Sequence, residues 1–153
     1  MNNSSPSADF SVLRSPFFGH IGLEVLEWCD GLARIGVDLR SFHLNRHGIT
    51  HGGVILSLID ESGAAAGNWC SVPGNIRRSV TVDLNAHFTG RASSGRVIAS
   101  ARVMSQGRKI FFAFSEIHDA GGMLIAFGSS THRRNSGSEP VTGTPLTVMP
   151  ATA

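Results

Sequence analysis

The sequence predicts an α+β domain in which an antiparallel sheet of about six strands wraps around one long helix. In most segments apolar and polar residues alternate, as they do in half-buried strands. Residues 54–69 differ, because their apolar side chains recur every three to four positions, the spacing of one helix face. Short turns join the consecutive strands after this segment, and such turns connect antiparallel neighbours.

Two alternating segments precede the predicted helix. Residues 21–25 and 33–39 place apolar side chains at every second position, and Cys-Asp-Gly at 29–31 predicts a hairpin turn between them. Residues 42–53 have no sustained period and contain three glycines, which is typical of a shaped loop. We therefore expect a hairpin and then a loop that leads into the helix.

The second half of the predicted helix is narrow. Residues 63–67 are all glycine or alanine, so another segment or a second subunit can pack very closely against them. Residues 71–74 then end the helix with Ser-Val-Pro-Gly turn chemistry.

Strands are predicted for most of the remaining chain. Residues 110–114 are apolar at successive positions, which favours a central strand covered on both faces. In residues 80–88 the alternation places Thr81 on one strand face with Asp83, Asn85 and His87. Asp-Ala-Gly-Gly at 119–122 turns the chain into the last strand.

Composition indicates one folded domain at residues 10–134, between flexible segments at 1–9 and 135–153 that are rich in small polar residues. The hydrophobic fraction of 41% is ordinary for a globular protein. Charged residues make up only 16%, which suggests that another subunit covers part of the surface.

Several classes of protein are disfavoured. The net charge of +2 and the lack of a long Lys/Arg run argue against nucleic-acid binding. Two cysteines are too few for a disulfide framework. The N-terminal residues do not resemble a signal peptide, and no apolar run is long enough to span a bilayer. We expect a soluble cytoplasmic protein that does not bind membranes.

The strongest candidate site begins at His51-Gly52-Gly53, directly before the predicted helix. Amides at a helix N-terminus are unpaired and carry positive dipole character, and glycine lets a ligand approach the backbone, so these amides can form an oxyanion hole. Asp60 can supply a base or nucleophile. It lies about 12 Å along the helix from Gly52, so either the two do not act together or the site is built from two subunits.

Glu61 directly follows Asp60 and is the alternative carboxylate. By helical position, Asp60 shares a face with Leu56 and Ala64, whereas Glu61 lies about 100° further round, towards Asn68. We predict from this more apolar setting that Asp60 has the more perturbed pKa, and we favour it as the catalytic group.

The pattern Asn45-x5-His51-Gly52-Gly53-x6-Asp60 resembles the signature of hotdog-fold acyl-CoA thioesterases, in particular the PaaI-like phenylacetate-degradation thioesterases. The resemblance covers roughly residues 20–132. It includes a strand at 79–85, a Gly-Arg turn at 107–108 and a Gly-Gly turn at 121–122.

This resemblance implies a hotdog fold and hydrolysis of acyl-CoA thioesters to a carboxylic acid and coenzyme A, with no cofactor beyond the coenzyme A of the substrate. It implies a homodimer or a dimer of dimers, with each site shared between two chains. Asp60 would be the catalytic carboxylate, Gly52 the oxyanion-hole amide, and Asn45, His51 and Thr81 the other catalytic residues. Thr81 would hold the water or the carboxylate.

Three further residues are predicted to bind substrate: Gly53, Glu61 and Arg108. Arg108 is chosen because guanidinium groups suit the phosphates of coenzyme A. Aromatic and fatty acyl chains are both compatible with the sequence, and Asp60 can attack the carbonyl or activate water.

Two other functions are compatible with a hotdog fold. A dehydratase or hydratase would carry a pattern such as Asp-x-Asn-Pro-x-His, which is not present. A non-catalytic acyl-CoA-binding domain would have lost Asp60 or Gly52, and both are present. His43, His47 and His51 have the spacing of metal ligands on a helix, but the intervening glycine argues against a helix there, so we predict no metal site.

Overall fold

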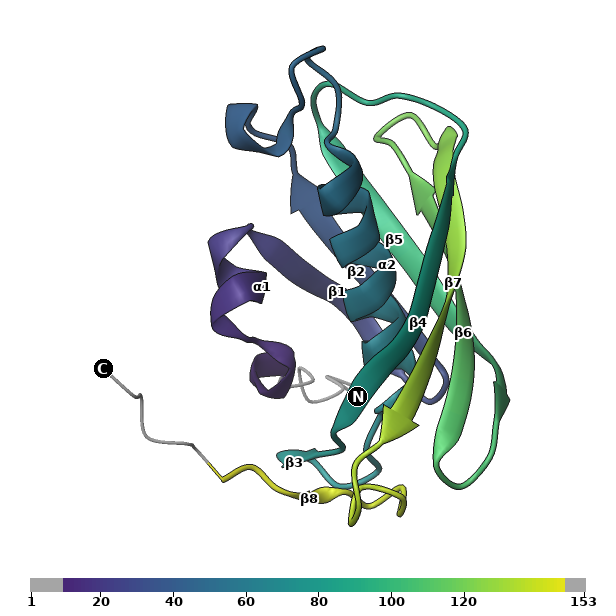
Figure 1. The fold of residues 1–153 in the computed structure, drawn as a ribbon. Helices are drawn as coiled ribbons and strands as arrows, with labels where there is room; N and C mark the ends of the chain where they lie inside the picture. Colours follow the sequence, from purple (N-terminus) through teal and green to yellow (C-terminus); the bar gives the residue numbers. More distant parts are fainter. Residues whose placement is uncertain (1–9, 148–153) are drawn as a thin grey trace, which may run out of the picture.

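The computed structural model describes residues 10–147, which form a six-stranded antiparallel sheet around one long helix, α2 (Gly52–Gly67). The strands are β1 (Leu23–Cys29), β2 (Leu32–Asp38), β4 (Ser79–Phe88), β5 (Arg96–Gln106), β6 (Ile110–His118) and β7 (Leu124–Arg134). Their order in the sheet is β1-β2-β5-β6-β7-β4, so β1 and β4 are the edges. The curved sheet lies along α2 (Figure 1). This confirms the predicted α+β class and the single long helix.

The smaller elements lie outside this sheet. They are the 3-10 helices η1 (Phe10–Leu13) and η2 (Ser41–His43), the short helix α1 (Pro16–His20), and the strands β3 (Asn75–Ile76) and β8 (Thr144–Pro145). Figure 1 shows α1 beside β1, away from β6 and β7. No helix in the described part of the chain is long and apolar enough to cross a membrane.

The core lies between α2 and the inner face of the sheet. Leu58 and Ile59 of α2 are fully buried, as are Ile35, Val97 and Ile117 of the facing strands. The three-to-four spacing in α2 places its apolar side chains on this face, while alternate positions of each strand meet them. The hairpin turn at residues 29–31 forms between β1 and β2 as predicted.

The narrow part of α2 is filled by this chain's own sheet. A Cβ atom at Gly63 would collide with the hydroxyl of Ser130, and one at Gly67 would collide with the ring of Phe111. Gly63 and Gly67 therefore make room for β7 and β6 of the same chain. Of the two partners that the sequence allows for these glycines, the structure shows the chain's own sheet, so their small size is not evidence for a second subunit.

A β-bulge in β4 changes which residues face the helix. The pairing of β4 with β7 shifts register between Thr81 and Asp83, so Val82 is an extra residue. Thr81 consequently faces α2 before the bulge, and Leu84 packs against the core after it. The prediction that Thr81 shares a face with Asp83 and the odd-numbered residues that follow it is wrong.

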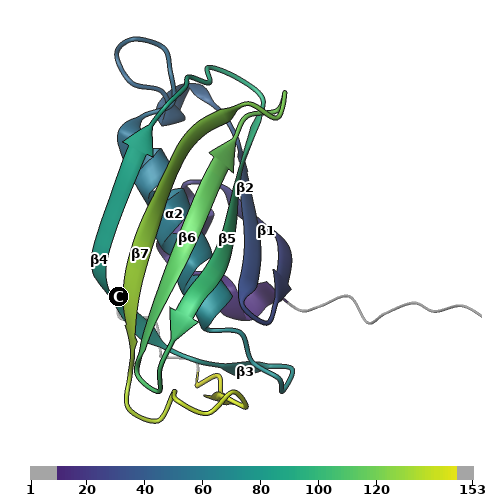
Figure 2. The ribbon, with the colours of Figure 1, turned by 90° about the vertical axis from the view of Figure 1, so that its right-hand side faces the viewer.

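No other element of residues 10–147 covers the outer face of the sheet. Figure 2 looks onto this face, with β6 among the central strands as predicted. Phe112 of β6 is nevertheless 48% exposed. The prediction that β6 is covered on both faces is therefore wrong for the single chain.

The chain continues to pack beyond residue 134. Strand β8 pairs with β3, Ser138 is buried, and the guanidinium of Arg77 donates to the carbonyl oxygens of Ser138 and Glu139. This differs from the flexible tail that the composition of residues 135–153 predicts. The predicted flexible segment at 1–9 and the last residues, 148–153, lie outside the described residues.

Candidate active site

The N-terminus of α2 offers an open backbone amide. His51 is the N-cap residue, and its Nδ1 accepts a hydrogen bond of 2.9 Å from the amide of Gly53. The amide of Gly52 donates to no residue in the described part of the chain. Gly52 is thus the amide left free at the positive end of the helix dipole. The amide of Gly53, predicted to bind substrate, is already engaged by His51.

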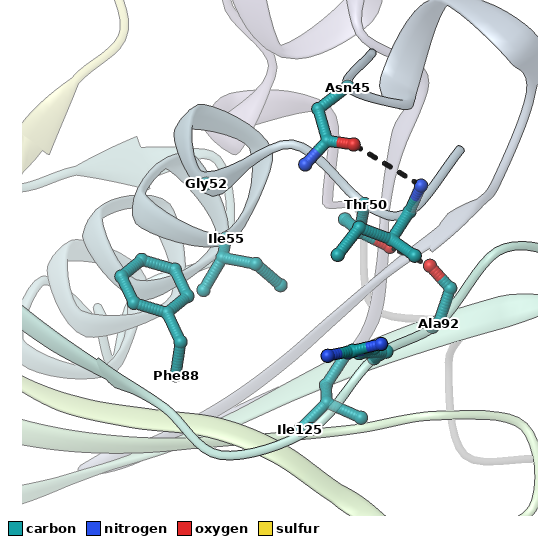
Figure 3. Close-up of a pocket in the computed structure, with 10 residues that line it drawn as sticks. Asn45, Thr50, Gly52, Ile55, Phe88, Ala92 and Ile125 are labelled. Carbon is teal, nitrogen blue, oxygen red and sulfur yellow. Dashed lines mark hydrogen bonds between the residues drawn. The ribbon is translucent and has the colours of Figure 1, made fainter. Parts of the chain in front are cut away.

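Asn45 shapes the loop before α2. Its side-chain oxygen accepts hydrogen bonds from the amides of His47, at 2.8 Å, and Ile49, at 3.4 Å. Figure 3 shows the amide nitrogen of Asn45 pointing away from the hydrogen bond that is drawn to its side-chain oxygen. Thr50 ties the loop to the segment before β5, because its amide and hydroxyl both donate to the carbonyl of Ala92, each at 2.8 Å. Asn45 is therefore placed to hold the loop that presents Gly52.

A cavity of about 260 Å³ opens beside Gly52. Its apolar wall contains Ile55, Phe88 and Ile125 (Figure 3). Asn45 and Arg91 are among its polar lining residues. Asp60 and Thr81 do not line it. Within one chain, the amide of Gly52 and the carboxylate of Asp60 therefore do not face the same cavity, as their separation along the helix predicts.

Asp60 lies further along α2, where it meets β4. The hydroxyl of Thr81 donates a hydrogen bond of 2.6 Å to Asp60 Oδ1. The β4 bulge brings Thr81 to this position, and Thr81 remains exposed at the edge of the sheet. The structure therefore unites two of the predicted catalytic residues.

His132 completes this group and was not among the predicted residues. Its Nδ1 lies 3.3 Å from Thr81 Oγ1 and its Nε2 lies 2.9 Å from Ser130 Oγ. Its ring is fully buried, and this burial lowers its pKa although the charge of Asp60 acts in the other direction. Alternation in β7 is the one sequence signal that could have placed His132 inward with Ser130.

Glu61 lies in a different environment from Asp60. Burial, with a smaller contribution from the charge of Asp60, raises the pKa of Glu61 to about 7. Its side chain lines a cavity of about 70 Å³ with Leu13, Phe18 and Arg77. The sequence predicts the more perturbed pKa for Asp60, and this prediction is wrong, because the strongly raised pKa belongs to Glu61. Glu61 faces the N-terminal segment, whereas the bond to Thr81 turns Asp60 towards β4.

The remaining predicted groups do not converge on Gly52 within the chain. Arg108 lies in the β5–β6 turn. The guanidinium of Arg134 donates hydrogen bonds to the carbonyls of Gly107 in this turn and of Gly67 in α2, so the turn lies beside the C-terminal end of α2.

His43 is buried and bonds to the carbonyl of Ile21. Among the residues that the structure describes, no three His, Cys, Asp or Glu side chains form a metal site.

Comparison with known proteins identifies related sequences and structures. A family model described as the thioesterase superfamily matches residues 47–126. This range contains Gly52, Asp60 and Thr81. A Mycobacterium tuberculosis protein named "Putative esterase" is 31% identical over 114 residues, which are 74% of this chain and 81% of that protein.

Solved structures agree with this match. A conserved protein from Pseudomonas aeruginosa has a TM-score of 0.75 at 27% identity, with 83% of this chain and 99% of that chain covered. A mutant form of the phenylacetic acid degradation protein PaaI from Thermus thermophilus has a TM-score of 0.69 at 27% identity, with coverage of 79% and 100%. These likenesses confirm the hotdog fold and the similarity to PaaI.

Proposed function

The chain belongs to the thioesterase superfamily, and we propose that it hydrolyses acyl-coenzyme A thioesters to a carboxylic acid and coenzyme A. The observation that carries this proposal is the carboxylate of Asp60, oriented by a 2.6 Å hydrogen bond from Thr81. A free amide at Gly52, on the same helix, supplies the complementary group. Hydrolysis of a thioester needs both an activated nucleophile and a site for the developing oxyanion.

The proposed reaction follows from these two groups. The thioester carbonyl oxygen accepts a hydrogen bond from the amide of Gly52, which stabilises the negative charge that forms on it. Asp60 removes a proton from water as the water oxygen bonds to the carbonyl carbon, or its carboxylate attacks the same carbon and water then cleaves the resulting anhydride. In either route the carbon–sulfur bond breaks, and the coenzyme A sulfur receives the proton that water has lost.

We propose that each site is shared by two chains of a homodimer. The cavity at Gly52 contains neither Asp60 nor Thr81, and about 12 Å of helix separates Gly52 from Asp60. Thr81 lies on β4, an edge strand of the sheet, where a second copy can approach it. Asp60 and Thr81 would then act on a carbonyl bound by the partner's Gly52.

Charge around Gly52 supports coenzyme A as the carrier of the acyl group. Arg91 lines the cavity at Gly52, and Arg46, His47 and His51 line an open hollow of about 560 Å³ that shares Asn45 with that cavity. No Asp or Glu of the described chain lines either one. Basic groups without acidic neighbours favour a ligand with several phosphates.

The deciding experiment measures thiol release from a panel of aromatic and fatty acyl-CoAs. The wild type should release thiol, and Asp60→Asn should lose nearly all of this activity because it can neither attack nor accept a proton. Asp83→Asn is the matched control, since Asp83 also lies on the chain's exposed surface beside the bulge but faces away from α2. Undiminished turnover by Asp60→Asn would contradict the proposal.

A truncated substrate tests the coenzyme A assignment separately. Acyl-N-acetylcysteamine has the same thioester and no phosphates, so Arg91→Ala should raise the KM for acyl-CoA and leave that for the truncated thioester unchanged. An equal change for both substrates would show that Arg91 does not recognise phosphate.

A further inference from the structure

A buried imidazole lies directly behind the Asp60–Thr81 pair. His132 is fully buried, and its ring stacks on Phe111 with centroids 4.9 Å apart and planes 17° from parallel. A Cβ atom at Gly63 would come within 3.2 Å of its Nε2, so the glycine of α2 makes room for the ring. Buried polar groups need hydrogen-bond partners, and hydroxyl groups lie beside both ring nitrogens of His132.

The protons of this group have one consistent arrangement. Thr81 has a single hydroxyl proton, which it donates to Asp60. The same hydroxyl can therefore only accept from His132, so Nδ1 of His132 carries the ring proton. Burial lowers the pKa of His132, which keeps the ring neutral near pH 7. Nε2 then accepts from Ser130, and donation runs in one direction from Ser130 to Asp60.

We infer that His132 is a positioning residue for hydrolysis, which fixes the hydroxyl of Thr81 so that its proton points at Asp60. The inference rests on the proposed function, because it assumes that Asp60 performs the chemistry. His132 is buried and does not touch substrate. Its contribution passes through Thr81, whose hydrogen bond to the carboxylate is polarised by the donor behind it.

A purely structural role would have different consequences from this one. If His132 only fills the space between α2 and the sheet, any smaller side chain costs stability, and kcat does not depend on a donor at the Nδ1 position. If His132 orients Thr81, kcat depends on that donor while KM does not. The two roles are therefore separated by a kcat-against-KM comparison and by rescue with a side chain that keeps the donor.

The experiment compares His132→Leu with His132→Asn, both as the full chain. Leucine removes the donor, whereas an asparagine nitrogen can lie close to the position of Nδ1. We expect His132→Leu to lower kcat about tenfold with KM unchanged, and His132→Asn to retain most of the activity. Ser115→Ala is the matched control, because Ser115 is equally buried and bonds to Ser62 of α2 without reaching Asp60. Its kcat should not change.

Coupling to Thr81 provides the second readout. The Thr81→Val variant already lacks the hydroxyl that donates to Asp60. Adding His132→Leu to this variant should therefore lower kcat no further. Additive losses would overturn the inference, as would equal losses for the Leu and Asn variants, or a folded His132→Leu with wild-type kcat. If His132→Leu does not fold, Ser130→Ala is measured in its place. This variant removes the hydroxyl that donates to Nε2 of His132 and should lower kcat about threefold. An unchanged kcat would overturn the inference.

Failure of the inference is distinguishable from failure of the proposed function. If only the inference fails, Asp60→Asn is inactive while the His132 variants behave like the wild type or lose kcat independently of Thr81. If the proposed function fails, the wild type releases no thiol from any acyl-CoA, or Asp60→Asn retains its activity.

Discussion

Thr81 illustrates how far a single residue can be understood from sequence. The family pattern suggests its role, but strict alternation assigns it to the face that points away from the helix. One extra residue, Val82, reverses that assignment. A pattern with a period of two cannot reveal where such an insertion falls, because the residues on either side still alternate. The partner of Thr81, His132, was missed because polar side chains at inward-facing positions of β7 do not show the apolar alternation of a core strand.

The hydroxyl of Thr81 gives a prediction at this scale. Thr81→Val keeps the shape of the side chain but removes the donor to Asp60. A hydrogen bond to a charged group contributes about 1.5–3 kcal/mol, so kcat should fall about tenfold to a hundredfold. Thr81→Ser should retain activity, and Thr131→Val of the neighbouring strand β7 serves as the control. Steady-state kinetics with an acyl-CoA measure the effect, and equal activity of the Val and Ser variants would refute it.

Glu61 gives a prediction about stability and pH. Burial raises its pKa from 4.5 to about 7, so the folded protein binds this proton more tightly than the unfolded chain does. The contribution of Glu61 to stability is therefore complete below pH 4.5 and is lost as the pH rises through about 7. Glu61→Gln removes that loss, so it should stabilise the protein more at pH 8 than at pH 5. Urea unfolding at both pH values measures this, and a pH-independent difference would rule it out.

At the scale of elements, the sequence is most informative where one period persists. The sixteen residues of α2 keep one apolar face, and His-Gly-Gly marks its start, so both the helix and its N-terminus were predictable. The segment after β7 was not predictable, because Ser, Thr, Pro and Gly predict flexibility by composition alone. Its packing depends on backbone carbonyl oxygens that accept hydrogen bonds from Arg77. Every residue has such a carbonyl, so the sequence does not indicate which ones Arg77 binds.

Arg77 therefore carries the prediction for the C-terminal segment. Its guanidinium donates to the carbonyls of Gly67 and Trp69 after α2, and of Ser138 and Glu139 in the segment after β7. Arg77→Met should lower the free energy of unfolding by about 2–3 kcal/mol, because several carbonyls lose a charged donor. Arg78→Met is the control, since the side chain of Arg78 is exposed. Urea unfolding monitored by circular dichroism checks both, and equal stability of the two variants would exclude this role.

The whole molecule divides the hydrolytic groups between two regions of one helix. The helix length and the position of the cavity separate Gly52 from Asp60 in every copy of the chain. The same separation was predictable from residue spacing, whereas the close packing at residues 63–67 was not. There, the sequence could not distinguish a partner from the chain's own sheet. The case for two subunits therefore depends on the site alone, and it can be tested by a substitution confined to the amide of Gly52.

Gly52→Pro removes this amide proton with little other change. Gly52 is the first residue of α2, a position where proline is favoured, and His51 has the extended conformation that precedes proline, with ψ of 138°. Gly52→Ala, whose Cβ would meet Phe88 at 3.5 Å, retains the amide and is the control. Gly52→Pro and Asp60→Asn should each be inactive alone. In a shared site, a hybrid dimer of the two restores one intact site, so unfolding and refolding an equal mixture should return about a quarter of wild-type activity. A site within one chain would return none, because each chain would still lack one of the two groups.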